Sequence, residues 1–287
     1  YSGVFADANV GTGKTVNITS SYSGADVNNY SVTDQSTTTG NIVPKALTAT
    51  ASASNKTYDG STNATLDVAL VTYTGLVGGD TFNGSYTGAF SDKNVGSGKS
   101  VTITSSYSGA DSGNYSVTDQ SSTTADISAK ALTATASASN KTYDGTTTAA
   151  TTLTFTGLVG SETLGQTVGS TFDNKNVGSN KTVTVNSITL ADGTSGGLAS
   201  NYSISAGQTT TADITAKSLS VSGVTASNKI YDGNTVATLD PIGVTYSGLV
   251  SGDSFAGSFN GSFSDKNIGT GKTVTITSSY SGSDVTN

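Results

Sequence analysis

The sequence lacks several residue types on which enzymes and metal proteins most often depend. Among its 287 residues there is no cysteine, histidine, methionine or tryptophan. There is also no arginine, and Glu162 is the single glutamate. Without cysteine the chain forms neither disulfides nor thiolate metal sites. Without histidine or cysteine it has no common general base and no thiol nucleophile, so we do not expect an enzyme.

Positive charge and long apolar runs are also scarce. Charged residues make up 11% of the chain, against about 25% in a typical soluble domain. The net charge is −7 and every cation is a lysine, whereas a nucleic-acid-binding protein needs a basic face, so no nucleic-acid partner is expected. No apolar run reaches the roughly 18 residues of a transmembrane helix, so we expect no membrane insertion within this segment. The absence of the easily oxidised residues cysteine and methionine favours a secreted, extracellular protein.

Glycine, serine and threonine are abundant, and apolar residues are spaced regularly among them. The 35 glycines would by themselves suit a disordered linker. However, Leu47, Ala49, Ala51 and Ala53 alternate with serine and threonine, and the same alternation begins again at Leu132. This period of two predicts β-strands that bury one face. No apolar stripe with a period of 3.6 residues indicates a helix longer than one turn.

Several motifs recur along the chain at nearly constant spacing. Asn-Lys-Thr-Tyr-Asp-Gly begins at Asn55 and Asn140, and at Asn228 with isoleucine in place of threonine. Further motifs are Gly-Leu-Val at Gly75, Gly157 and Gly248, Asn-Tyr-Ser at Asn29, Asn114 and Asn201, and Asp-Lys-Asn-Val-Gly at Asp92 with variants at Asp7, Asn174 and Asp265. A Lys-(Ala/Ser)-Leu boundary falls at Lys45, Lys130 and Lys217, which gives periods of 85 and 87 residues. A period of this length suits one small domain per repeat.

The chain therefore divides into four parts. Residues 1–44, the N-terminal segment, are the C-terminal half of a truncated repeat. Residues 45–129 and 130–216 are complete repeats, the first and second full repeats, and residues 217–287 form a partial repeat that lacks its C-terminal strand. Since both ends cut through a repeat, we expect the chain to be a segment of a longer array. No Gly- or Pro-rich linker separates the repeats, which favours little independent motion between them.

Each repeat is predicted to be an all-β domain. Several short strands per period, with turn residues every 8–12 positions, are typical of an antiparallel β-sandwich, and we predict Ig-like domains arranged as an extended rod. β-Grasp-like repeats are the alternative. Phe90, Phe172 and Phe263 stand at the same step before the Asp-Lys-Asn-Val-Gly turn or its variant, and Phe90 is predicted to be a core residue. Gly223 interrupts the first strand of the partial repeat and is interpreted as a bulge.

The recurring motifs resemble the YDG-type repeats of large bacterial surface adhesins. Asn-Lys-Thr-Tyr-Asp-Gly is followed in order by Gly-Leu-Val-Gly, Lys-Asn-Val-Gly, Asn-Tyr-Ser and Ala-Asp-Ile-Ser-Ala-Lys, so the resemblance covers essentially the whole chain. Such repeats occur in filamentous-haemagglutinin-like exoproteins beside the related MBG repeats. The resemblance implies a secreted, surface-attached stalk of β-domains and no catalytic residue. The departures are Asp7-Ala8-Asn9, which lacks the lysine, Asp173-Asn174-Lys175, and a longer loop over 190–201.

Two kinds of side chain are candidates for more than a structural role. Asp80, Asp111 and Asp253 lie in predicted loops and are candidate ligands for a Ca²⁺ ion that would stiffen a hinge, the one cofactor that these loops suggest. Ordinary solvated turn residues are the alternative. Three lysines follow an asparagine in predicted strands and are candidates for Lys–Asn isopeptide crosslinks, while the alternative is that their ammonium groups reach water. These lysines are Lys56, Lys141 and Lys229.

The function expected from these observations is structural. The leading hypothesis is a stalk or spacer of a secreted bacterial adhesin or extracellular filament that projects an adhesive region away from the cell. Its partners would be neighbouring repeats of the same chain and other copies of itself. The alternative is a multivalent module that binds glycans or matrix, such as extracellular polysaccharide, and contributes to adhesion or biofilm by avidity. Tyr22, Tyr107 and Tyr280 are candidate sugar-stacking residues, unless they pack on the sheets.

Overall fold

The computed structural model describes all residues from Tyr1 to Asn287 and contains almost only β-structure. Its helical elements are three 3₁₀ turns, η1 (Val27–Asn29), η2 (Ser112–Asn114) and η3 (Ala199–Asn201). The all-β prediction, with no helix longer than one turn, is thereby confirmed. No helix has the length and apolar character that crossing a membrane requires.

The strands follow the repeats. Up to Ser128 they are β1 (Ser2–Phe5), β2 (Gly11–Thr19), β3 (Thr37–Ile42), β4 (Lys45–Ala53), β5 (Lys56–Thr57), β6 (Asn63–Ala64), β7 (Leu66–Thr74), β8 (Asn83–Phe90), β9 (Gly96–Ser108), β10 (Tyr115–Asp119) and β11 (Ser122–Ser128). From Lys130 they are β12 (Lys130–Ala131), β13 (Thr133–Ala138), β14 (Lys141–Thr142), β15 (Thr151–Thr156), β16 (Leu164–Phe172), β17 (Gly178–Asp192), β18 (Tyr202–Ser203), β19 (Thr209–Thr215), β20 (Ser220–Ser222), β21 (Thr225–Ala226), β22 (Val236–Ala237), β23 (Leu239–Asp240), β24 (Thr245–Ser247), β25 (Ala256–Phe263) and β26 (Val274–Ser281).

The chain forms two compact units, and each is described by itself. The first unit holds Tyr1–Lys130 together with Ser200–Tyr202. The second unit holds Ala131–Ala199 and Ser203–Asn287. The first full repeat thus lies in the first unit, and the partial repeat lies in the second.

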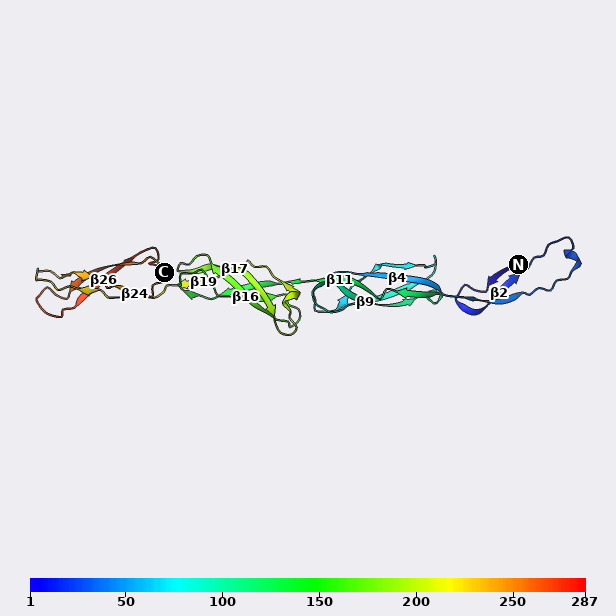
Figure 1. The fold of residues 1–287 in the computed structure, drawn as a ribbon, viewed down its shortest axis with the longest axis horizontal. Helices are drawn as coiled ribbons and strands as arrows, with labels where there is room; N and C mark the ends of the chain where they lie inside the picture. The colour runs from blue at the N-terminus through cyan, green and yellow to red at the C-terminus, as the bar shows by residue number, and fades with distance from the viewer. The chain divides into compact units, whose positions relative to one another are not determined.

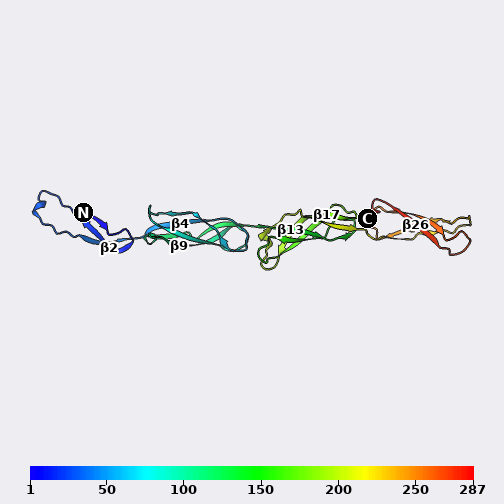
Figure 2. The same ribbon diagram turned by 180° about the vertical axis from the view of Figure 1, so that it is seen from behind.

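The first full repeat consists of two sheets around a common core. One has the strand order β10-β4-β7 and the other the order β5-β11-β9-β8-β6. Figures 1 and 2 show β4 and β9, one from each sheet, running alongside one another when seen from opposite sides. A cluster of Leu47, Phe82 and Tyr115 packs against Tyr107 of β9, so residues of both sheets contribute to it.

The prediction of purely antiparallel pairing is wrong for this repeat. β10 pairs with β4 in parallel, with Tyr115 opposite Lys45, and β11 pairs with β5 in parallel. The connections between these strands run through the intervening hairpins, so the last two strands return to lie beside the first two. Propensity and alternation are the same for parallel and antiparallel strands, and the sequence therefore did not reveal the direction.

The predicted alternation does position the core. In β4, Leu47, Ala49 and Ala51 are buried while the serines and threonines between them are exposed. Phe90 is 3% exposed and Val101, its direct neighbour on β9, is fully buried. The prediction that Phe90 is a core residue is confirmed, and Phe172 is buried in the same way. Phe263 is only half-buried.

The second full repeat repeats this plan, with β16 and β17 longer than β8 and β9. β16 and β17 form its longest ladder, which shifts register between Gly169 and Ser170. β17 continues through Asp192, so the first part of the predicted long loop at 190–201 is strand. The sheet order is β14-β19-β17-β16, beside the pairs β13-β15 and β12-β18.

The partial repeat has fewer paired strands than the full repeats. β20 pairs only with β24, β21 only with β23, and β25 lies between β22 and β26. Gly223 lies between β20 and β21 with φ of +90°, where a Cβ would come within 2.0 Å of the Gly243 carbonyl oxygen. The predicted interruption at Gly223 thus separates two short ladders, and only glycine suits that backbone.

Candidate interface between consecutive repeats

The Asp-Lys-Asn-Val-Gly turn exposes one backbone N–H and one asparagine side-chain amide to a neighbouring part of the chain. In the first full repeat the N–H of Asn94 donates to Oδ1 of Asp92 at 2.8 Å, which closes an Asx turn. Lys99 Nζ forms an ion pair with the same carboxylate at 2.7 Å. Both interactions hold the pKa of Asp92 below its ordinary value. The turn therefore stays rigid, and it leaves the side chain of Asn94 and the N–H of Val95 available to a partner.

An asparagine of the Asn-Tyr-Ser motif binds this turn. The N–H of Val95 donates to Oδ1 of Asn201 at 2.9 Å, and Nδ2 of Asn201 donates to Oδ1 of Asn94 at 3.1 Å. Asn201 is fully buried. A buried amide of this kind is stable only if its donor and acceptor are both used, and here both are.

The same exchange occurs at two other places. In the first unit the N–H of Val10 donates to Asn114 at 2.9 Å, and Asn114 donates to Asn9 at 3.2 Å. In the second unit the N–H of Val177 donates to Asn287 at 3.0 Å, and Asn287 donates to Asn176 at 3.4 Å. In each case the turn belongs to one part of the chain and the asparagine to the next. We call this arrangement the asparagine junction.

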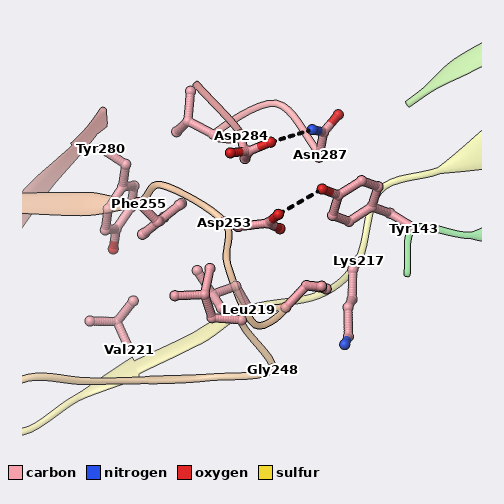
Figure 3. A pocket seen from close by; sticks show the side chains of 13 residues that line it. Tyr143, Lys217, Leu219, Val221, Gly248, Asp253, Phe255, Tyr280, Asp284 and Asn287 are labelled. Carbon is pink, nitrogen blue, oxygen red and sulfur yellow. Dashed lines mark hydrogen bonds between the residues drawn. The ribbon is translucent and has the colours of Figure 1, made fainter. Parts of the chain in front are cut away.

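In the second unit a charged cluster adds to the asparagine junction. Lys175 of the second full repeat lies 3.3 Å from Oδ1 of Asp253 and 3.1 Å from Oδ1 of Asp284, both in the partial repeat. The phenol of Tyr143 donates to Asp253 at 2.9 Å, as Figure 3 shows together with the contact between Asp284 and Asn287. The Asp253 side chain is only 5% exposed. A carboxylate this buried requires such partners.

The protonation states follow from these contacts. The N–H of Ser254, the hydroxyl of Ser283 and the Lys175 ammonium lower the pKa of Asp284 to about 2. Hydrogen bonds to Tyr143, Asp284 and Asp253 raise the pKa of Lys175. Burial raises the pKa of Tyr143. The Asp284 carboxyl is therefore ionised and the Lys175 amine is therefore charged at neutral pH.

Apolar contacts complete the junction in the second unit. Val250 of the partial repeat packs against the core cluster that contains Tyr143, Phe172 and Ile214 of the second full repeat. A Cβ at Gly145 would lie 2.8 Å from Cγ1 of Val250, so the glycine of Tyr-Asp-Gly leaves room for this valine. In the second full repeat the Tyr-Asp-Gly motif is thus a turn whose tyrosine and glycine both contact the next repeat.

The junctions of the first unit differ in detail. The ring of Tyr58 stacks edge-on against Tyr202 with centroids 5.4 Å apart. Lys93 lies over the same ring at 6.0 Å. At Val10 the corresponding lysine position is Ala8, so that junction has the asparagine without the cation.

The candidate Ca²⁺ ligands Asp80, Asp111 and Asp253 each accept hydrogen bonds from other groups of the protein. Asp80 accepts a hydrogen bond from the phenol of Tyr115 at 2.5 Å, and Asp111 accepts from the N–H of Thr81 at 2.7 Å. Asp253 is engaged by Tyr143 and Lys175, as described above. Nowhere do three or more carboxylates gather at one point. The arrangement brings these aspartates to the junction as acceptors for tyrosine, lysine and backbone groups.

The recurrent lysines close the Tyr-Asp-Gly turn. Lys56 Nζ lies 2.8 Å from Asp59 and donates to the carbonyl oxygen of Ser61 at 2.8 Å, with the Phe90 ring at 5.5 Å. The Lys56 side chain is 16% exposed, and these partners hold its ammonium. Lys141 and Lys229 make the corresponding contacts with Asp144 and Phe172, and with Asp232 and Phe263.

The isopeptide hypothesis has one geometric candidate. Lys229 Nζ lies 2.9 Å from Oδ1 of Asn234. The nearby acid, Asp232, has its pKa lowered by the Lys229 ammonium and by the backbone N–H of Asn234, so it is ionised rather than available to donate a proton. Lys56 and Lys141 bind carboxylates, hydroxyls and backbone carbonyl oxygens instead.

The candidate sugar-stacking tyrosines pack on other rings. The Tyr107 ring lies 5.2 Å from Phe82, and the Tyr280 ring lies 5.2 Å from Phe255. Tyr22 contacts Tyr1 edge-on at 5.9 Å and remains 43% exposed. Packing on the sheets therefore accounts for two of the three.

Sequence reasoning missed the asparagine junction, although its signal was present. The turn asparagines Asn9 and Asn94 precede Asn114 and Asn201 of the Asn-Tyr-Ser motif by 105 and 107 residues, which is about one period plus twenty. Asparagine in a turn is usually explained by its tolerance of turn geometry. Two recurrent asparagines at a fixed long separation would have indicated that they meet.

Comparison with known proteins identifies the repeats. The family model of the YDG domain matches residues 43–125, 128–212 and 215–287. No curated protein matches the chain. No solved structure matches it either, so the Ig-like and β-grasp assignments stay predictions.

Proposed function

The chain belongs to the YDG domain family, of which it contains three tandem copies, and from this premise we propose that it is a structural spacer. The proposed role is the stalk of a secreted bacterial adhesin or extracellular filament. The asparagine junction is the observation that carries the proposal. A hydrogen-bonded contact that recurs at each step of an array restrains every repeat against its neighbour, which is the property that a spacer needs.

Two features make the junction suitable for transmitting force or holding distance. The connections are short, since β3 ends at Ile42 and β4 begins at Lys45, and Ala129 alone separates β11 from β12. The junction also combines partly buried hydrogen bonds with apolar packing and, in the second unit, an ion pair. Stability in such an array is the sum of each repeat's own stability and its contacts with the nearest neighbours.

Small-angle scattering on the full chain tests the proposal. If each of the four parts advances the chain by about 40 Å, the radius of gyration is roughly 45 Å. A compact globule of the same length has a radius of gyration of about 19 Å. We expect a radius of gyration near roughly 45 Å. Asn114→Ala should decrease it, because the change removes the hydrogen bonds of one asparagine junction. A value near 19 Å would refute the extended spacer.

A glycan and matrix-protein array separates the spacer from a binding module. The spacer hypothesis expects no saturable binding of the chain to immobilised polysaccharides. Saturable binding that is lost on Tyr22→Ala would favour the multivalent adhesion module instead. The proposed location at the bacterial surface is tested by antibody labelling of intact cells that produce the protein, because a cytoplasmic protein stays unlabelled until the cells are broken.

A further inference from the structure

In the first full repeat, a glutamine just after β10 closes the edge of the three-stranded sheet. β10 pairs in parallel with Lys45–Ala49 of β4. Beyond β10, the N–H of Gln120 donates to the carbonyl oxygen of Ala49 at 3.2 Å, and Oε1 of Gln120 accepts from the N–H of Ala51 at 3.0 Å. The edge of β4 is thus covered as far as Ala51. Ala49 and Ala51 are accordingly buried, at 3% and 8% exposed.

The second full repeat departs from this arrangement after Ser203. The N–H of Leu132 still donates to the carbonyl oxygen of Ser203 at 2.8 Å. The chain then crosses to the other sheet, where the N–H of Gly207 donates to the carbonyl oxygen of Val185 at 2.9 Å. Gly207 occupies the position of Gln120, since each stands five residues after the tyrosine of Asn-Tyr-Ser. The glutamine that closes the edge of the first full repeat is therefore absent here.

The early crossing leaves one edge of β13 without a partner strand. β13, labelled in Figure 2, pairs only with β15. Ser139 donates to Ala150 on the β15 side, and backbone groups alternate in direction along a strand, so those of Ala134 and Ala136 point to the opposite side. No backbone group pairs with them there. Both alanines are half-buried, whereas their counterparts in β4 are buried.

A groove of about 510 Å³ lies beside this free edge, and we call it the β13 groove. It is lined by Leu132 and Ala134 from one part of the chain and by Ile204–Gln208 from the other, all within the second unit. Its volume falls in the range of about 300–1,000 Å³ that is usual for ligand sites. Nε2 of Gln208 donates to the carbonyl oxygen of Ser205 at 2.8 Å, but its Oε1 is enclosed without a partner. An enclosed acceptor without a donor is costly, so the packing around the groove is incomplete.

We propose that the β13 groove binds an extended peptide, which adds to β13 as a parallel strand. In the first full repeat the equivalent place is filled by residues 118–120, so the bound arrangement is visible there. The alternating N–H and C=O groups of a strand match the free groups of Ala134 and Ala136. A glutamine in the peptide would accept from the N–H of Ala136, as Gln120 accepts from Ala51.

The lining of the groove favours a peptide over other ligands. No aromatic ring lines it, so it offers no stacking platform for a sugar. No charged side chain lines it either, so it offers no ion pair to an acidic or basic ligand. The inference is independent of the spacer role, because a stalk holds its repeats in series whether or not a peptide binds to one of them.

The first test titrates the full chain, isotope-labelled at alanine, with a short peptide and follows the backbone amide resonances. The probe is acetylated and amidated Thr-Asp-Gln-Ser, the sequence of residues 118–121. We expect saturable shifts of the Ala134 and Ala136 amides, half-maximal at about 1 mM, the order that a few net backbone hydrogen bonds supply. The equivalent Ala49 and Ala51 lie on an edge that is already covered, so their amides should not respond.

Two methylated peptides test whether binding uses strand pairing. N-methylation of the threonine removes the N–H that would donate to the carbonyl oxygen of Leu132, and we expect the affinity to fall at least tenfold. N-methylation of the aspartate is the matched control, because alternation turns the N–H of the corresponding Asp119 away from β4. The affinity should then stay within about twofold. Absence of saturable shifts at Ala134 and Ala136, equal effects of the two methyl groups, or saturation by a neutral oligosaccharide in place of the peptide would overturn the proposal.

The second test closes the groove from within the chain. Gly207→Gln restores the glutamine of the first full repeat, and the φ of +114° at Gly207 disfavours any other residue in the present crossing. We expect the segment to pair with β13 instead, and the affinity for the tetrapeptide to fall at least tenfold. Gly160→Gln is the matched control: Gly160 also has a positive φ, +56°, but lies outside the groove with open space around it. Its affinity should stay within about twofold, with circular dichroism confirming that both variants fold. An unchanged affinity in Gly207→Gln would overturn the proposal.

Discussion

Replacing Phe90 by alanine tests the assignment of the core in the first full repeat. The side chain is 3% exposed, lies beside the fully buried Val101, and has the Lys56 ammonium over its ring. The change removes roughly 120 Å² of buried apolar surface, which at about 25 cal/mol per Å² corresponds to about 3 kcal/mol. The cavity that remains raises the expected cost to about 3–5 kcal/mol.

Hydrogen exchange read by mass spectrometry on the full chain is the suitable assay, because peptides from 45–129 report on that repeat alone. A loss of 3–5 kcal/mol corresponds to exchange about 10²- to 4 × 10³-fold faster for its core amides. Phe263→Ala is the matched control, since Phe263 occupies the same position in the partial repeat but is only half-buried. We expect a clearly smaller acceleration of hydrogen exchange for Phe263→Ala. Acceleration of less than about fivefold for Phe90→Ala, or equal effects at both sites, would refute the core assignment.

Three further predictions concern the junctions and turns. Asn201→Ala leaves the Val95 N–H without its acceptor, and we expect a loss of about 1–3 kcal/mol in chemical denaturation; an unchanged midpoint would contradict the asparagine junction. The pKa of Asp284 is about 2 when folded and about 3.9 when unfolded. The ionised carboxylate therefore makes its full contribution to the free energy of unfolding above about pH 4, and that contribution is lost as the pH falls toward 2. Denaturation midpoints measured across that range should decrease. Gly75→Ala should destabilise more than Gly157→Ala. Both glycines have φ of +105°, but only at Gly75 would a Cβ come as close as 2.7 Å to a carbonyl oxygen; equal losses in denaturation would argue against that clash.

Much of the local structure is determined by the sequence alone. The alternation in Lys45–Ala53 predicts a strand with Leu47 inside, and Leu47 is 1% exposed. The fixed position of Phe90 before its turn predicts a core aromatic. The Asp-Lys-Asn-Val-Gly motif predicts a turn. These features depend on contacts between residues near in sequence or on burial of one strand face, and both leave a periodic pattern that is visible in one chain.

Strand direction and long-range pairing are decided only by the tertiary structure. Tyr115–Asp119 runs parallel to Lys45–Ala49, although nothing in either sequence distinguishes a parallel neighbour from an antiparallel one. Asn201 meets Val95 across 106 residues, while its own motif suggests a local turn. The Lys56 ammonium of β5 lies over the ring of Phe90, which belongs to β8. In each case the partner lies far away in sequence or on another strand, so the interaction stabilises the protein only once the sheets have formed.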